Sequence, residues 1–139
     1  VPSFVNLAAK VLIERDLRAN FLFNTLADAA QATSLLDEQY RDQVGVNVLG
    51  LGNFSADFDI AVLVCPSNEG NENLRRIEAV ERVIYQGPPK TMLSKTERKR
   101  FLRRPIILLN PVLEAIHPCS TDVKKVVPMF MRDFEAVYF

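Results

Sequence analysis

The segment Ile60-Ala-Val-Leu-Val-Cys65 is an unbroken run of apolar residues, and a second run, Ile106-Ile-Leu-Leu109, follows later in the chain. Strands that are apolar on both faces are typical of the centre of a parallel sheet with helices on both sides. Both runs are too short to span a bilayer as a helix. They therefore predict two central strands, lying side by side, and no transmembrane segment.

Helical and extended patterns alternate around these two runs. Apolar periodicity predicts helices over 3–15, 26–41, 71–85, 94–102 and 121–133, and strands over 17–24, 44–50, 60–65, 105–110 and 135–139. Ser94-Lys-Thr-Glu97 has the spacing of a helix-capping box. Pro128 should kink or end the last helix.

This alternation predicts an α/β fold. We expect a Rossmann-like three-layer sandwich with a mostly parallel sheet of about five strands in the order 2-1-3-4-5. Val44, Val46 and Val48 would share one face of the 44–50 strand, and Gly45, Asn47 and Leu49 the other, which indicates a half-exposed edge strand. The direction of that strand stays open, because the link over 51–59 is short for a parallel crossover.

Composition limits the class of protein. The 139 residues suit one domain over 1–139, with an apolar content of 48% that can form one core. Seventeen basic and seventeen acidic residues cancel, so no overall field draws the chain to nucleic acid or to an anionic membrane. Two cysteines do not make a disulfide scaffold.

The common motifs of catalysis and cofactor binding are missing from the sequence. The turn after the first predicted strand, Asn24-Thr-Leu-Ala-Asp28, has no glycine for a dinucleotide phosphate, and no P-loop or nucleophile elbow occurs. His117 is the single histidine, and neither cysteine has metal-ligand spacing. We therefore expect no catalytic residues, no metal and no cofactor, which favours a role other than that of an enzyme.

Small polar residues follow three of the predicted strands. Asn24, Ser67 and Asn110 would lie at the carboxyl edge of the sheet, where α/β proteins bind ligands. The alternative is that they only form turns. If they bind a ligand, the chain would be a small-ligand or nucleotide-related enzyme that uses this edge.

The two cysteines are candidates for a redox pair. Cys65 ends a predicted strand, and Cys119 precedes the last predicted helix at the same edge. A helix N-terminus lowers the pKa of a thiol. The alternative is that Cys65 is a small core residue and that Cys119 has no role.

Positive charge gathers in a basic insertion at about 88–104. Seven of the seventeen cations lie within 90–104, against Glu97 alone. The candidate partner-binding residues are Lys95, Arg98, Lys99, Arg100 and Arg103. Such a stretch is either a solvated insertion or a surface for an acidic protein, an anionic lipid or RNA. Phe101 alone interleaves the cations, which disfavours stacking of nucleic-acid bases.

Five segments, in order, carry a family resemblance. They are Asn20-Phe-Leu-Phe-Asn-Thr-Leu-Ala-Asp-Ala-Ala-Gln-Ala, Val46-Asn-Val-Leu-Gly-Leu-Gly, Asp59-Ile-Ala-Val-Leu-Val-Cys-Pro-Ser, Arg104-Pro-Ile-Ile-Leu-Leu-Asn-Pro-Val-Leu and Phe134-Glu-Ala-Val-Tyr-Phe. Over about residues 18–139 the chain resembles a domain-of-unknown-function family of plastid and cyanobacterial proteins. That family includes the low photosystem II accumulation assembly factor and the C-terminal domain of a chloroplast adenylate kinase.

The resemblance implies a place and a role. It implies a chloroplast protein of the stroma or the thylakoid surface that serves photosystem assembly by protein binding. The family supplies no catalytic residues to carry over. From the resemblance and the basic stretch together, we expect a non-catalytic assembly module whose partner is a subunit of a photosynthetic complex. Peripheral membrane association is a further option, and nucleic-acid binding through 90–104 is the alternative.

Overall fold

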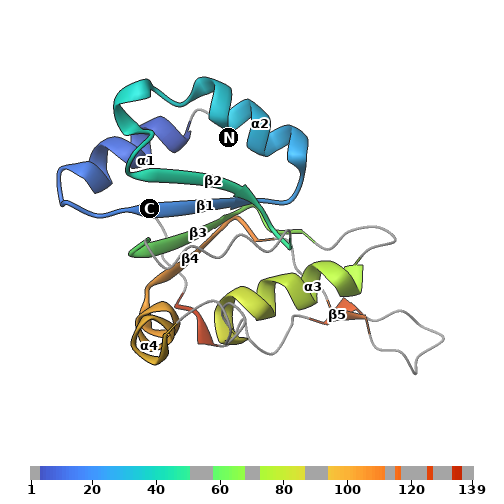
Figure 1. The fold of residues 1–139 in the computed structure, drawn as a ribbon. Coiled ribbons are helices and arrows are strands. Elements are labelled where there is room, and N and C mark those ends of the chain that lie inside the picture. The colour runs from blue at the N-terminus through green and yellow to red at the C-terminus, as the bar shows by residue number, and fades with distance from the viewer. Residues whose placement is uncertain are drawn as a thin grey trace.

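The computed structural model describes residues 4–50, 58–67, 73–86, 94–111, 115–116, 125–126 and 133–135. Within these ranges, β1 (Ala19–Phe23), β2 (Val44–Val48), β3 (Ile60–Val64) and β4 (Ile106–Leu109) form one parallel sheet in the order β2-β1-β3-β4 (Figure 1). The α/β class is therefore confirmed. β2 runs parallel to β1 at the edge of the sheet, which resolves the open direction of the 44–50 strand.

Helices cover both faces of this sheet. α1 (Phe4–Ile13) and α2 (Leu26–Leu35) lie on one side, and α3 (Asn73–Glu81) and α4 (Lys95–Arg103) lie on the other (Figure 1). The helix expected over 26–41 ends earlier, at Leu35, and a 3₁₀ turn, η1 (Glu38–Tyr40), follows it. α3 continues as a π-helical turn, η2 (Arg82–Gln86).

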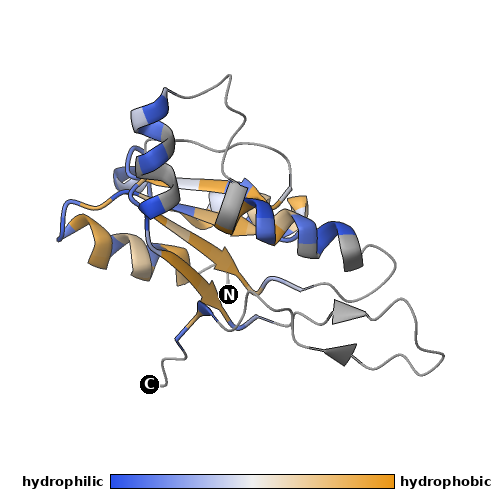
Figure 2. Ribbon diagram, turned by 90° about the horizontal axis from the view of Figure 1, so that it is seen from below, coloured by the Kyte–Doolittle hydropathy of each residue, from blue (hydrophilic) through white to orange (hydrophobic). Residues whose placement is uncertain are grey.

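The cores lie on the two faces of the central strands. Phe21 of β1 and Val62 of β3 face α1 and α2, whereas Leu22 and Leu63 face Val80 of α3. The apolar colour of the strands contrasts with the hydrophilic described residues of α4 (Figure 2). β3 is central and β4 lies beside it, as predicted. Among the described strands, however, β4 pairs with β3 alone and leaves Ile107 48% exposed, so that β1 and β3 form the centre.

The C-terminal part departs from the sequence expectation. Lys125–Val126 form a short strand, β6, that pairs antiparallel with β5 (Ala115–Ile116), so the helix expected over 121–133 is wrong at this point. β-Branched valines favour extended backbone, and a proline disfavours the helical conformation of the residue before it. Of the strand expected over 135–139, Glu135 has no regular structure and the rest lies outside the described residues.

None of the helices in the described ranges combines the length and the apolar character needed to cross a bilayer.

Candidate functional site

Asn24 links two strand ends at the carboxyl edge of the sheet. It follows β1, and its Nδ2 donates to the carbonyl oxygen of Cys65 at 2.6 Å, while its Oδ1 accepts from the backbone N–H of Ser67 at 3.3 Å. The structure thus brings Asn24 and Ser67 together, because β1 and β3 are parallel neighbours. Both polar atoms of the Asn24 side chain hold the turn after β3, which makes this residue a structural clamp.

Asn110 lies further along the same edge, two strands from Asn24. It follows β4, and β3 separates β4 from β1. Its φ of 45° is in the left-handed region, which asparagine tolerates better than most residues. Asn110 is exposed at the end of its strand. The three expected ligand residues therefore follow three strands at one edge of the sheet, and a hydrogen bond joins two of them, Asn24 and Ser67.

Cys65 also adopts a left-handed conformation, with φ of 46°. Its thiol is free and partly buried, and the residue packs against the core below α1 and α2. Its backbone N–H donates to the carbonyl oxygen of Leu109 at 2.8 Å, which fixes the end of β3 against β4. Cys119 lies outside the described residues, so the redox pair stays a prediction.

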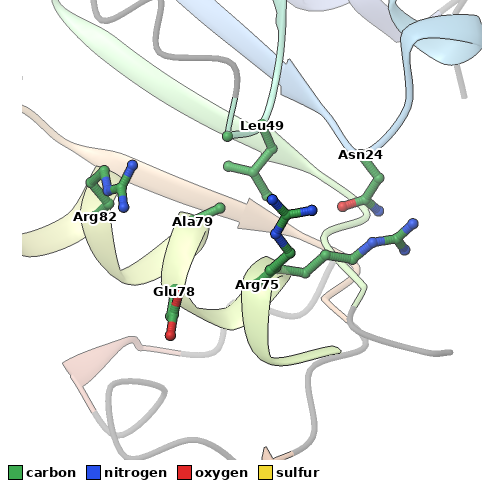
Figure 3. Close-up of a pocket in the computed structure, with 8 residues that line it drawn as sticks. Asn24, Leu49, Arg75, Glu78, Ala79 and Arg82 are labelled. Carbon is green, nitrogen blue, oxygen red and sulfur yellow. The ribbon is translucent and has the colours of Figure 1, made fainter. Parts of the chain in front are cut away.

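A cavity of about 500 Å³ opens at the carboxyl ends of β1 and β2 (Figure 3). Residues from the strand ends and from one side of α3 and η2 line it: Asn24, Leu49, Gly50, Arg75, Arg76, Glu78, Ala79 and Arg82. Ligands of open α/β sheets bind beyond the carboxyl ends of the strands, and the point where the strand order reverses, between β1 and β3, lies beside Asn24. The cavity lies next to the Asn24 clamp.

Arginines dominate the charge of this cavity. Three arginines stand against one glutamate among its lining residues. Nη1 of Arg76 donates to the carbonyl oxygen of Ser67 at 3.4 Å, while Arg75 and Arg82 are exposed. In Figure 3 the carboxylate of Glu78 points away from Asn24 and Leu49. The side of the cavity that faces the strand ends is therefore electropositive.

Gly50 shapes the opposite wall. Its φ of 89° lies in the region that favours glycine, and a Cβ placed there would stand 3.4 Å from Cβ of Ala79. That distance is an ordinary contact, so the positive φ rather than a lack of space favours glycine where the end of β2 lies near α3. The sequence predicted a helix over 71–85, and its arginines were not among the predicted site residues.

The basic insertion contains α4, which begins with the expected capping box. Ser94 Oγ accepts from the N–H of Glu97 at 3.2 Å, and the N–H of Ser94 donates to Glu97 Oε2 at 2.8 Å. Hydrogen bonds from the Ser94 side chain and then from its backbone lower the pKa of Glu97. The one acidic side chain of α4 is therefore engaged at the helix start.

Three of the expected partner-binding residues share one face of α4. Lys95, Lys99 and Arg103 recur at four-residue spacing, which aligns them along the helix, and all three are exposed. We call them the α4 cation stripe. Arg98 and Arg100 also belong to α4, but their side chains lie outside the described part of the structure.

A second cavity of about 500 Å³ adjoins this stripe at the amino ends of the strands. Its lining residues are Phe58, Asp59, Thr96, Lys99, Arg103 and Arg104. The guanidinium of Arg18 lies over the ring of Phe58, 5.7 Å from its centroid, and the N–H of Arg18 donates to Asp59 Oδ2 at 3.0 Å. Burial lowers the pKa of Arg104 to about 10, so this residue stays positive at neutral pH.

In the described ranges, no group of three side chains of the metal-binding types lies close enough to hold an ion. No protein-family model, curated protein or solved structure matches the chain. The resemblance to the plastid family therefore stays a prediction, and the two basic surfaces at opposite ends of the sheet are the starting point for function.

Proposed function

We propose that the chain is a non-catalytic protein-binding module for the assembly of photosynthetic complexes in a plastid, and that the α4 cation stripe is its contact with an acidic partner. The observation that carries this proposal is the alignment of Lys95, Lys99 and Arg103 on one exposed face. The plastid and the photosynthetic partner follow from the sequence resemblance.

The stripe is unfavourable for the isolated helix. Like charges four residues apart destabilise a helix by about 0.2–0.5 kcal/mol per pair, and Lys95–Lys99 and Lys99–Arg103 are two such pairs. Glu97 does not pair with them along the helix, because it lies two residues from Lys95 and from Lys99 and therefore faces another side. Local features that work against folding concentrate at functional sites. Carboxylates of a partner would relieve the repulsion.

The adjoining cavity favours protein over RNA as the partner. Protein interfaces are enriched in arginine and aromatic residues, and Phe58 and Arg103 both line this cavity. RNA binding of the single-stranded type needs aromatic faces on which bases stack. Arg18 already covers a face of Phe58. The cavity thus suits acidic side chains that pair with the cations, together with an apolar side chain that enters beside Phe58.

The proposal is tested by capture from a plastid extract. A tagged wild-type chain is compared with Lys95→Glu/Lys99→Glu/Arg103→Glu, in which the stripe is reversed. The matched control is Lys10→Glu/Arg15→Glu/Arg41→Glu, which changes net charge equally at exposed positions outside α4. Thermal melting establishes that all three chains fold.

We expect the wild type and the control to capture the same photosynthetic subunit and the stripe variant to lose it. Equal capture by all three chains would remove α4 from the interaction. Two further experiments test other partners. The wild-type chain is mixed with anionic lipid vesicles or with single-stranded RNA in the absence of other proteins. If it bound the vesicles or the RNA and the stripe variant did not, the partner of the stripe would be a membrane or a nucleic acid and not a protein.

A further inference from the structure

We propose that the cavity at the carboxyl ends of β1 and β2 is a binding site for a small molecule that carries a diphosphate group. This site lies at the opposite end of the sheet from the α4 cation stripe and is independent of the protein contact proposed above. Its volume of about 500 Å³ falls within the range of small-molecule sites.

The charge of the cavity selects an anion. Its arginines outnumber its one acidic residue, and Glu78 points away from the strand ends (Figure 3). A guanidinium presents a planar fork of N–H donors that matches two oxygens of a phosphate. Arg75 and Arg76 also lie at the start of α3, where the helix dipole disfavours cations and an anion would reverse that cost.

The spacing of the arginines favours more than one anionic group. Arg75 and Arg82 are seven residues apart, which places them on the same side of the helical segment and about 10 Å apart along its axis. Two neighbouring phosphates can be held by both of these long side chains. A single carboxylate would engage one and leave the other unused.

The walls of the cavity are prepared for a ligand rather than for a side chain of the protein. Gly50 lines the cavity without a side chain, which leaves its backbone accessible to a ligand. Asn24 uses one Nδ2 hydrogen for the carbonyl of Cys65 and retains a second donor hydrogen. The clamp thus fixes the strand end that borders the site, and its remaining hydrogen can be donated to a phosphate oxygen.

The test is a nuclear magnetic resonance titration of the ¹⁵N-labelled chain with inorganic pyrophosphate, adenosine diphosphate and adenosine, in a background of excess sulfate. We expect saturable shifts of the Gly50 and Ala79 amide signals with pyrophosphate and none with adenosine. If adenosine diphosphate bound more tightly than pyrophosphate, the natural ligand would be a nucleotide. If it bound more weakly than pyrophosphate, the ligand would be a free diphosphate or one that carries another substituent. Absence of saturable shifts with both phosphates would overturn the site.

Variants localise the binding. Arg75→Gln/Arg82→Gln should weaken pyrophosphate binding by about tenfold or more, because each charge-assisted hydrogen bond contributes roughly that factor. Lys10→Gln/Arg15→Gln on and after α1 removes the same charge elsewhere and should leave the affinity unchanged. If the double variant fails to fold, Arg82→Gln alone is used, since Arg82 is exposed. Unchanged affinity in either cavity variant would refute the proposal, whatever the outcome for the α4 stripe.

Discussion

Replacing Asn24 should separate its role as a clamp from a role as a ligand group. Asn24→Ala removes two hydrogen bonds that join the end of β1 to the turn after β3, one to the carbonyl of Cys65 and one from the N–H of Ser67. A hydrogen bond of this kind contributes about 0.5–1.5 kcal/mol net. The free energy of unfolding should therefore fall by about 2 kcal/mol, which corresponds to roughly 8 °C in melting temperature for a chain of this size.

Asn24→Asp gives a sharper version of the same test. The carboxylate can still accept from Ser67, but it cannot donate to Cys65, and it places an anionic oxygen where the donor stood 2.6 Å from the carbonyl oxygen. The loss at neutral pH should equal or exceed that of the alanine variant. Part of it should return as the pH falls and the acid becomes protonated, because the acid can then donate.

The assay is urea unfolding followed by circular dichroism, with Gln39→Ala as the control at an exposed position of η1. The control should stay within about 0.5 kcal/mol of the wild type, as exposed substitutions usually do. If Asn24→Ala were as mild as the control, the clamp would not exist in solution. The side-chain amide of Asn24 would then be free to bind a ligand in the cavity.

Three further changes test other points of the chain. Gly45→Ala should lower the free energy of unfolding by about 1–3 kcal/mol, because the new methyl group would meet the ring of Phe58. Phe58→Leu in the same chain should recover part of this loss. If it recovered none, the contact with Phe58 would be excluded. Because Asn110 has a φ of 45°, Asn110→Ala should lower the free energy of unfolding in urea by about 1 kcal/mol, whereas Asn110→Gly should not lower it. Equal losses in the two variants would exclude the left-handed conformation. The lowered pKa of Glu97 means that its carboxylate stabilises α4 fully above the ordinary glutamate pKa of about 4.3. This stabilisation should be lost as the pH falls through the lowered pKa. Amide exchange in α4 should detect the loss in the wild type and not in Glu97→Gln.

The spacing of apolar residues predicted much of the fold, because it depends directly on which side chains are buried. The unbroken apolar run Ile60–Val64 lies between β1 and β4 as expected, whereas the second run, Ile106–Leu109, pairs with β3 alone among the described strands. β1 was harder to recognise as central, because it contains Asn20. That residue is 1% exposed, and its Oδ1 accepts from Nδ2 of Asn47 on β2 at 2.7 Å. A partner on another strand cannot be read from the sequence around Asn20.

The C-terminal error has a similar cause. Ser120 and Thr121 resemble helix caps, but Val126, Val127 and Pro128 favour extended backbone, and the β-pairing of Lys125–Val126 with Ala115–Ile116 decides the outcome. Capping propensities of about 1 kcal/mol are readily outweighed by tertiary pairing.

The candidate sites were only partly predictable. Parallel strands end at one edge, so Asn24 and Ser67 could be expected near each other. Their direct hydrogen bond depends on the turn after β3, which is a tertiary feature. Arg75 and Arg82 have the spacing of any solvated helix face, and they mark a cavity only because Leu49 and Gly50 at the end of β2 lie opposite.

The proposed binding of an acidic protein by the α4 cation stripe is tested by the affinity of the chain for the subunit that it captures from the plastid extract. Biolayer interferometry would give the dissociation constant for the wild-type chain, the Lys95→Glu/Lys99→Glu/Arg103→Glu chain and its matched control at low and at physiological ionic strength. We expect the dissociation constant to rise about thirtyfold or more in the stripe variant and to stay unchanged in the control. For the wild-type chain it should rise with the salt concentration. An affinity that responds neither to salt nor to reversal of these three charges would contradict the proposal.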